Sequence, residues 1–180
     1  MGTDFIWGVL PKNVQELNQS YDLFKKVITD FGKIISGFRR FWRFRKKAKM
    51  KKAVLGIRAH VGVIDSIFST LRAKMRIALD RNDRTGFKMH QDEICQIYSR
   101  VTDTSHELLQ ALSVCERYLD GYPKLEDALH LKLESEGVDD YGDESGPCDD
   151  LDAFAWWVNV AGDYTRKALD LLNEHLEYEY

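Results

Sequence analysis

The chain has 180 residues, enough for one domain with a sizeable core, and its 44% hydrophobic and 31% charged composition is typical of a folded globular protein. The longest uncharged run, residues 153–162, is too short to span a bilayer as a helix, and the first residues lack the basic region of a secretory signal. Three cysteines at unrelated spacings, Cys95, Cys115 and Cys148, exclude a disulfide framework and a zinc pattern. We therefore expect a single cytoplasmic domain, 1–180.

The net charge is only -3, but it is distributed very unevenly along the chain. Residues 31–64 carry +11 because no Asp or Glu occurs between Asp30 and Asp65, whereas residues 121–180 carry -12. Such asymmetry indicates interaction surfaces, or two parts of one chain that meet.

An apolar heptad stripe predicts a first long helix over residues 12–45. Its members recur at alternating steps of three and four: Val14, Leu17, Tyr21, Phe24, Ile28, Phe31, Ile35 and Phe38. No strand produces this period. Pro11 suits the first turn of such a helix, where its missing N–H costs nothing.

A second stripe predicts a helix over residues 50–81. Its members are Val54, Ile57, Val61, Ile64, Phe68, Leu71, Met75 and Ala78. This stripe is displaced by two residues from an extension of the first, so we infer a turn near 45–50. Because neither Gly nor Pro marks that turn, one continuous kinked helix stays open as an alternative. Residues 81–86, Arg-Asn-Asp-Arg-Thr-Gly, predict a loop.

A third stripe predicts a helix over residues 86–120, and Gly121 and Pro123 end its pattern. Its members are His90, Ile94, Ile97, Val101, Thr104, Leu108, Ala111, Cys115 and Tyr118. The acidic connector, 121–148, follows; we expect a short helix around 124–134 and then an acidic loop. A last helix is predicted over 149–178, and it begins at aspartates that suit a helix N-terminus.

These elements predict an all-α fold. Four long helices of similar length, with short first and second connections, favour an antiparallel up-down-up-down four-helix bundle, with a short extra helix and an acidic loop before the last helix. In this topology the tip of the first hairpin and the acidic connector lie at the same end of the bundle.

Residues 39–52, here called the basic segment, contain nine basic and no acidic residues. A cluster of this kind with interleaved aromatic rings can be a solvated tip, bind an anionic membrane or an acidic protein, or contact nucleic acid through phosphates and bases. The candidate binding residues are Arg39, Arg40, Trp42, Arg43, Phe44, Arg45, Lys46, Lys47, Lys49, Lys51 and Lys52.

We expect a non-enzymatic interaction or regulatory protein, cytoplasmic or peripheral at a membrane, whose basic segment binds an anionic partner, an acidic protein or a membrane. Nucleic acid is a further partner to consider, and the helix faces allow a homo-oligomer. The acidic connector would mask the basic segment through Asp139, Asp140, Asp143, Glu144, Asp149 and Asp150. The layout is similar to that of the membrane-attacking bundles of cell-death executioners, which implies a membrane-active four-helix effector as an alternative; the resemblance is architectural and carries over no residues.

A second resemblance concerns catalysis. The pairs Arg84 with His90 and Arg100 with His106 resemble the Arg-x4–6-His motif of HEPN-class helical RNases. Arg84 with His90 is the better pair, because a loop enters a helix there and His90 falls on the apolar stripe. No phosphate loop, nucleophile elbow or zinc pair occurs. We expect no catalytic residue, cofactor or metal, and keep a HEPN-like RNase using Arg84 and His90 as an alternative.

Overall fold

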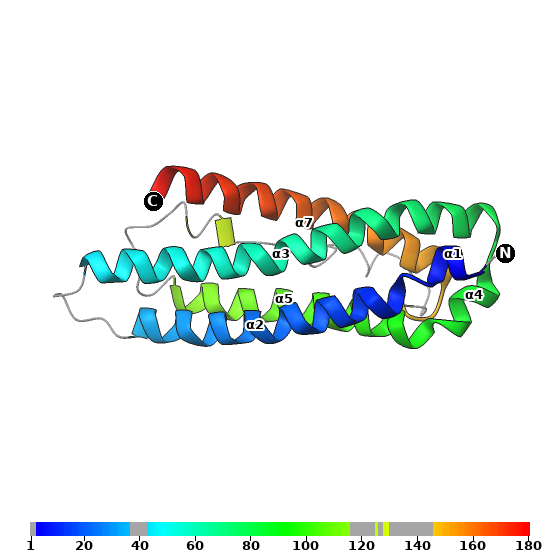
Figure 1. The fold of residues 1–180 in the computed structure, drawn as a ribbon, viewed down its shortest axis with the longest axis horizontal. Coiled ribbons are helices and arrows are strands. Elements are labelled where there is room, and N and C mark those ends of the chain that lie inside the picture. Colours follow the sequence, from blue (N-terminus) through cyan, green and yellow to red (C-terminus); the bar gives the residue numbers. More distant parts are fainter. Residues whose placement is uncertain (1–2, 37–42, 116–124, 126–127, 130–145) are drawn as a thin grey trace.

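The computed structural model describes residues 3–36, 43–115, 125, 128–129 and 146–180. Every secondary-structure element in this part of the chain is a helix, as Figure 1 shows, so the all-α prediction is confirmed there. The elements are α1 (Thr3–Trp7), α2 (Leu10–Ser36), α3 (Arg43–Asp80), α4 (Arg84–Met89), α5 (Gln91–Cys115) and α7 (Leu151–Glu179).

Helices α2 and α3 form an antiparallel hairpin. Ser20 of α2 contacts His60 of α3 at 2.6 Å, and Gly56 of α3 lies against Val27 of α2, so residue numbers rise on one helix as they fall on the other. The alternative of one kinked helix is therefore wrong. Helix α3 begins at Arg43 and not near residue 50. Arg, Lys, Ala and Met are strong helix formers, and they carry the helix through the basic sequence.

Helix α5 lies beside α2 and runs in the same direction. Arg100 donates to the Asn18 side chain at 2.7 Å, and Lys25 pairs with Glu107 further along both helices. The single helix predicted over 86–120 is divided at His90, whose N–H donates to carbonyls of the preceding short helix α4.

Helix α7 runs antiparallel to α3 but parallel to α5 (Figure 1). Its start lies beside α4, since Arg84 pairs with Asp150 at 2.8 Å, and its middle lies beside the middle of α3, since Arg166 pairs with Asp65 at 3.0 Å. Strict up-down-up-down alternation is therefore wrong for the last helix. Residues 116–150 separate α5 from α7, and at roughly 3.3 Å per residue such a stretch is long enough to return along the bundle.

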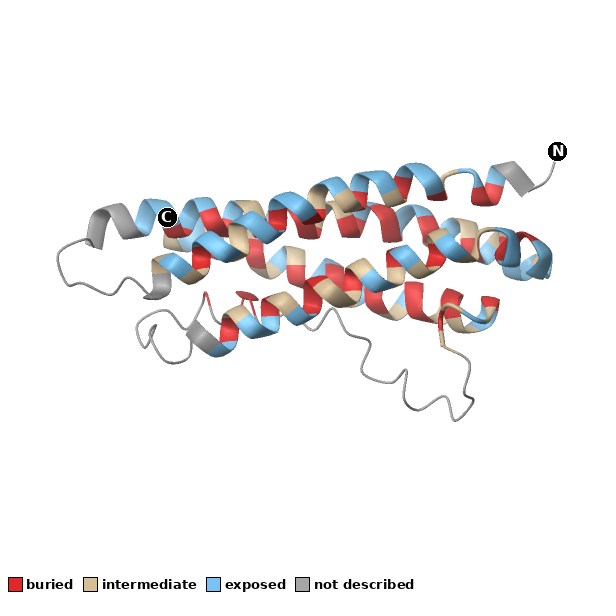
Figure 2. Ribbon diagram, turned by 90° about the horizontal axis from the view of Figure 1, so that it is seen from below, coloured by how far each residue is buried: buried red, intermediate tan, exposed pale blue. Residues whose placement is uncertain are grey.

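The buried residues of the long helices lie mainly along the sides that adjoin the other helices, as the colouring of the ribbon in Figure 2 shows. Most members of the predicted stripes are buried, including Phe24 and Phe31 on α2 and Val61 and Phe68 on α3, and α3 packs most extensively against α7 and α2. At the end of the bundle near the N-terminus, the fully buried Trp7 donates its indole N–H to Asp83 at 2.8 Å.

One segment of α3, Lys47–Asp80, is long and apolar enough to cross a membrane by length and composition. The expectation that no helix could span a membrane was therefore too strong. It was based on the longest uncharged run, but a helix that carries a few charges can still be long and apolar enough to cross a bilayer. Core helices of soluble proteins can have the same length and composition, and 44% of the most apolar stretch of this segment is buried inside the fold.

Candidate anionic-partner surface

The described part of the basic segment forms the first turns of α3. Lys47, Lys49, Lys51 and Lys52 are exposed there, whereas Met50 is only 4% exposed and belongs to the core. Met50 fixes the rotation of the helix about its axis. The lysines therefore project from a regular helix and not from a loop, and an ordered backbone lowers the entropy cost of binding a partner.

Two of these lysines contact the end of α7. The ammonium groups of Lys47 and Lys51, one helical turn apart, each lie 5.9 Å from the centroid of the Tyr180 ring. Tyr180 packs edge-on against the buried His175, with ring centroids 5.5 Å apart. The cation–π contacts orient these two lysines toward α7 without neutralising their charge. Glu177 lies in the same last turn of α7, so the end of this helix brings acidic sequence close to the basic segment.

The remaining predicted binding residues divide into two groups. The backbone of Arg43, Phe44, Arg45 and Lys46 forms the first turn of α3. The others lie outside the described residues: Arg39, Arg40 and Trp42.

The predicted mask is not assembled where it was expected. Asp150 caps the start of α7 and pairs with Arg84, which follows the end of α3. The 38 residues of α3, about 57 Å at 1.5 Å per residue, separate this end from the basic segment. Asp149 and Asp150 therefore lie at the opposite end of the bundle. The other predicted mask residues lie outside the described part of the chain: Asp139, Asp140, Asp143 and Glu144.

The two residues of the RNase alternative contact different partners. The terminal nitrogens of Arg84 bind Asp150 at 2.8 Å and Asp152 at 2.7 Å, and hydrogen bonds to these carboxylates raise the pKa of Arg84. The His90 ring stacks on Trp7, with centroids 6.2 Å apart. The guanidinium is thus held by the start of α7, and a catalytic role for the pair stays a prediction.

Among the described residues, no group of three or more His, Cys, Asp and Glu side chains could hold a metal ion. Cys95 and Cys148 are both free thiols. Burial, together with a hydrogen bond to Cys95, raises the pKa of Cys148 to about 12. A thiol of this pKa is protonated at neutral pH and is a weak nucleophile.

A buried polar contact that the sequence did not predict joins three helices. The ring of His60, 1% exposed, contacts Ser20 of α2 through Nδ1 at 2.6 Å and Thr104 of α5 through Nε2 at 2.8 Å. The Thr104 hydroxyl donates its only proton to the Arg100 carbonyl, so it must accept from His60. Nε2 therefore carries the proton of a neutral ring. Burial lowers the pKa of His60 to about 4, in agreement with this state.

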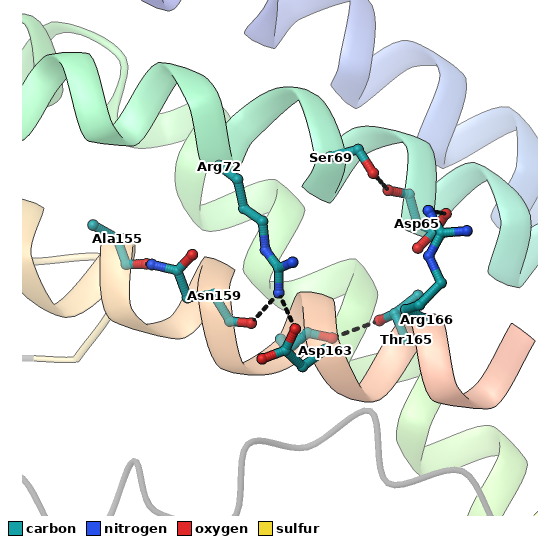
Figure 3. Close-up of polar contacts among 9 residues, drawn as sticks. Asp65, Ser69, Arg72, Ala155, Asn159, Asp163, Thr165 and Arg166 are labelled. Carbon is teal, nitrogen blue, oxygen red and sulfur yellow. Dashed lines mark hydrogen bonds and ion pairs between the residues drawn. The ribbon is translucent and has the colours of Figure 1, made fainter.

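A second unpredicted feature is a polar ladder between α3 and α7, shown in part in Figure 3. Its rungs recur every seven residues on both helices and join Arg58 to Asn173 (2.5 Å), Asp65 to Arg166 (3.0 Å) and Arg72 to the Asn159 carbonyl (2.5 Å). Arg72 also binds Asp163 at 2.6 Å. The seven-residue spacing of these side chains could be found in the sequence, but only once α7 was known to run antiparallel to α3.

No protein-family model, curated protein or solved structure matches this chain.

Proposed function

We propose that this protein is a four-helix-bundle interaction protein whose basic segment binds an anionic partner surface. The observation that carries the proposal is the exposure of four lysines, Lys47, Lys49, Lys51 and Lys52, within the first turns of one helix. On α3 itself, Asp65 is the only acidic residue before Asp80, and it is occupied by Arg166.

Electrostatics supports this assignment. The four lysines lie within about 8 Å of one another along the helix axis, inside one Debye length at physiological salt, so their potentials add. Such a cluster attracts anionic partners and accelerates their association. Asp149 and Asp150 lie too far away to mask it, so the proposal does not rely on them.

The test compares two charge-reversed variants. The first replaces Lys47, Lys49, Lys51 and Lys52 by Glu. The matched control makes the same change of charge at four exposed cations on other surfaces: Lys26, Arg81, Lys88 and Lys167. The probes are vesicles that contain phosphatidylserine and immobilised polyglutamate.

We expect the first variant to lose binding to at least one of these probes by more than about tenfold, since each basic residue near an anionic surface contributes roughly 1 kcal/mol. The control should weaken binding far less. Circular dichroism verifies that both variants fold. Equal losses in the two variants, or unchanged binding by the first, would overturn the proposal.

A second candidate is a membrane-active bundle, which the apolar composition of Lys47–Asp80 favours. This function requires that the protein release a dye trapped inside phosphatidylserine vesicles. Binding without release would reject it and leave the interaction function in place.

A further inference from the structure

The outward face of α3 has an unusual composition. One row of its residues between the basic segment and the far end of the helix recurs at steps of three and four and is uncharged: the exposed Leu55, Ala59, Ser66, Thr70 and Ala73, with the partly exposed Gly62 and Val63 among them. We call these seven residues the outer face. From Leu55 to Ala73 the face extends about 27 Å.

Two charged residues beside the outer face bind α7. Arg58 donates to Asn173 on α7, and Asp65, 8% exposed, pairs with Arg166 on the same helix. The exposed Arg58 therefore borders the outer face with its guanidinium bound to α7, and no charged residue lies within the row itself. By contrast, the exposed residues of α2 include both acids and bases, such as Glu16, Asp22 and Lys26.

Both ends of the outer face are basic. Lys49 and Lys52 precede it, and Lys74 and Arg76 follow it. Lys74 is held in place by its hydrogen bond to the Phe5 carbonyl at 2.6 Å. Leu55, directly after the first cluster, is 44% exposed and is the largest apolar side chain of the face. The surface is thus an uncharged, weakly apolar helix face between two clusters of positive charge.

We infer that the outer face of α3 lies on an anionic lipid bilayer, parallel to its surface. A bilayer presents anionic headgroups over any length, so it can meet both basic clusters at once, and its interfacial region accepts the uncharged residues between them. A helix that lies in this way keeps Arg58 and Asp65 paired with α7, so the bundle stays intact.

Other anionic partners match the face less well. Nucleic acid presents phosphates continuously, and the uncharged middle of the face would leave many of them without a cation. An acidic protein would bind through the lysines at the start of α3 alone, and the apolar side chain of Leu55 would not add to its affinity. This inference rests on the proposed function of the basic segment and names the partner of that segment.

The discriminating experiment uses two exposed leucines. Leu55 lies on the outer face, whereas Leu23 of α2, 63% exposed, lies on another helix and serves as the control. Each is replaced by Gln, which removes apolar surface without changing the charge. Ala59→Gln is a second outer-face variant. Flotation with vesicles of pure phosphatidylcholine, and with vesicles that also contain phosphatidylserine, measures binding.

We expect the native protein to bind only the vesicles that contain phosphatidylserine. Leu55→Gln should weaken this binding by about five- to tenfold, the effect of losing the burial of a half-exposed leucine. Leu23→Gln should change this binding by less than about twofold, because substitutions at exposed positions away from the binding surface have small effects. Retention on polyglutamate should be the same for both leucine variants.

The outcomes separate the two proposals. If Leu55→Gln and Ala59→Gln bind phosphatidylserine vesicles as well as the native protein, the bilayer inference is overturned, whereas the role of the lysines stands if their reversal abolishes binding. If duplex RNA or DNA binds more tightly than vesicles at the same salt concentration, nucleic acid replaces the bilayer as partner. If the lysine reversal changes no binding, the proposed function itself fails.

Discussion

The rung between Asp65 and Arg166 should determine how α7 aligns with α3. If α7 slips by seven residues in either direction, Arg166 meets Arg58 or Arg72 in place of Asp65. The native register is the one that pairs opposite charges at the central rung. Arg166→Gln should therefore destabilise the fold and weaken the choice of register.

The magnitude follows from the burial of the two side chains. The Asp65 side chain is 12% exposed, and that of Arg166 is 58% exposed, with 3.0 Å between the charged atoms. Water screens the exposed partner, so the pair is weaker than a fully buried one. Loss of Arg166 leaves the Asp65 carboxylate buried without its cation, and we expect a cost of about 1–2 kcal/mol, or roughly 2–8 °C in Tm.

Urea unfolding followed by circular dichroism measures this cost. Lys167→Gln, at the adjacent exposed cation, is the control and should change stability by less than about 0.5 kcal/mol. Asp65→Asn combined with Arg166→Gln should cost about 1 kcal/mol less than the sum of the two single changes. Simple additivity would show that the two side chains do not stabilise each other, and the explanation of register would be wrong.

Three further predictions concern other parts of the bundle. Gly62→Ala should stabilise α3 by about 0.5–1 kcal/mol, because the added Cβ meets open space. Gly56→Ala should destabilise the protein, because the added Cβ would lie 2.6 Å from a Val27 methyl carbon. Urea unfolding of both variants tests this contrast. As pH falls from about 6.5 to about 4, the free energy of unfolding should drop by about 3 kcal/mol because the unfolded chain protonates His60 and the folded protein does not; a His60→Gln variant should lack this part of the pH dependence in urea titrations. Asp83→Ala removes the N-cap of α4 and the acceptor of the Trp7 indole, so it should cost about 2–3 kcal/mol in thermal or urea unfolding; a loss below about 0.5 kcal/mol would contradict this account.

The heptad stripes predicted the helices and most of the core because burial of one apolar face is a local, periodic property. Phe24, Val61 and Ile97 all lie where their stripes placed them. The division at His90 was missed, because His90 satisfies the apolar pattern while its N–H bonds to the end of α4.

The direction of α7 could not be read from the same pattern. A heptad stripe has no direction in space, and alternation was inferred from the similar helix lengths and the short first and second connections, although the third connection is longer. Pairing of Arg84 with Asp150 fixes the start of α7 beside α4, and that long-range contact leaves no periodic signal. This error also led to the predicted mask, since Asp149 and Asp150 follow α7 to the opposite end of the bundle.

Composition alone singled out the basic segment, but it did not predict that the described part of this segment is helical. The described lysines belong to a helix whose buried side includes Met50, and Tyr180 lies against two of them. The contact with Tyr180 joins residues more than 125 positions apart in the sequence, so only the tertiary fold reveals it.

The most direct test of the central claim is flotation of the native protein with phosphatidylserine vesicles, beside the variant in which Lys47, Lys49, Lys51 and Lys52 are replaced by Glu. We predict that the native protein floats with the vesicles at about 0.15 M salt, that high salt releases it, and that the folded variant stays in solution. Equal flotation of the two proteins, or no flotation of the native protein, would contradict the assignment of the start of α3 as a surface that binds anionic lipid.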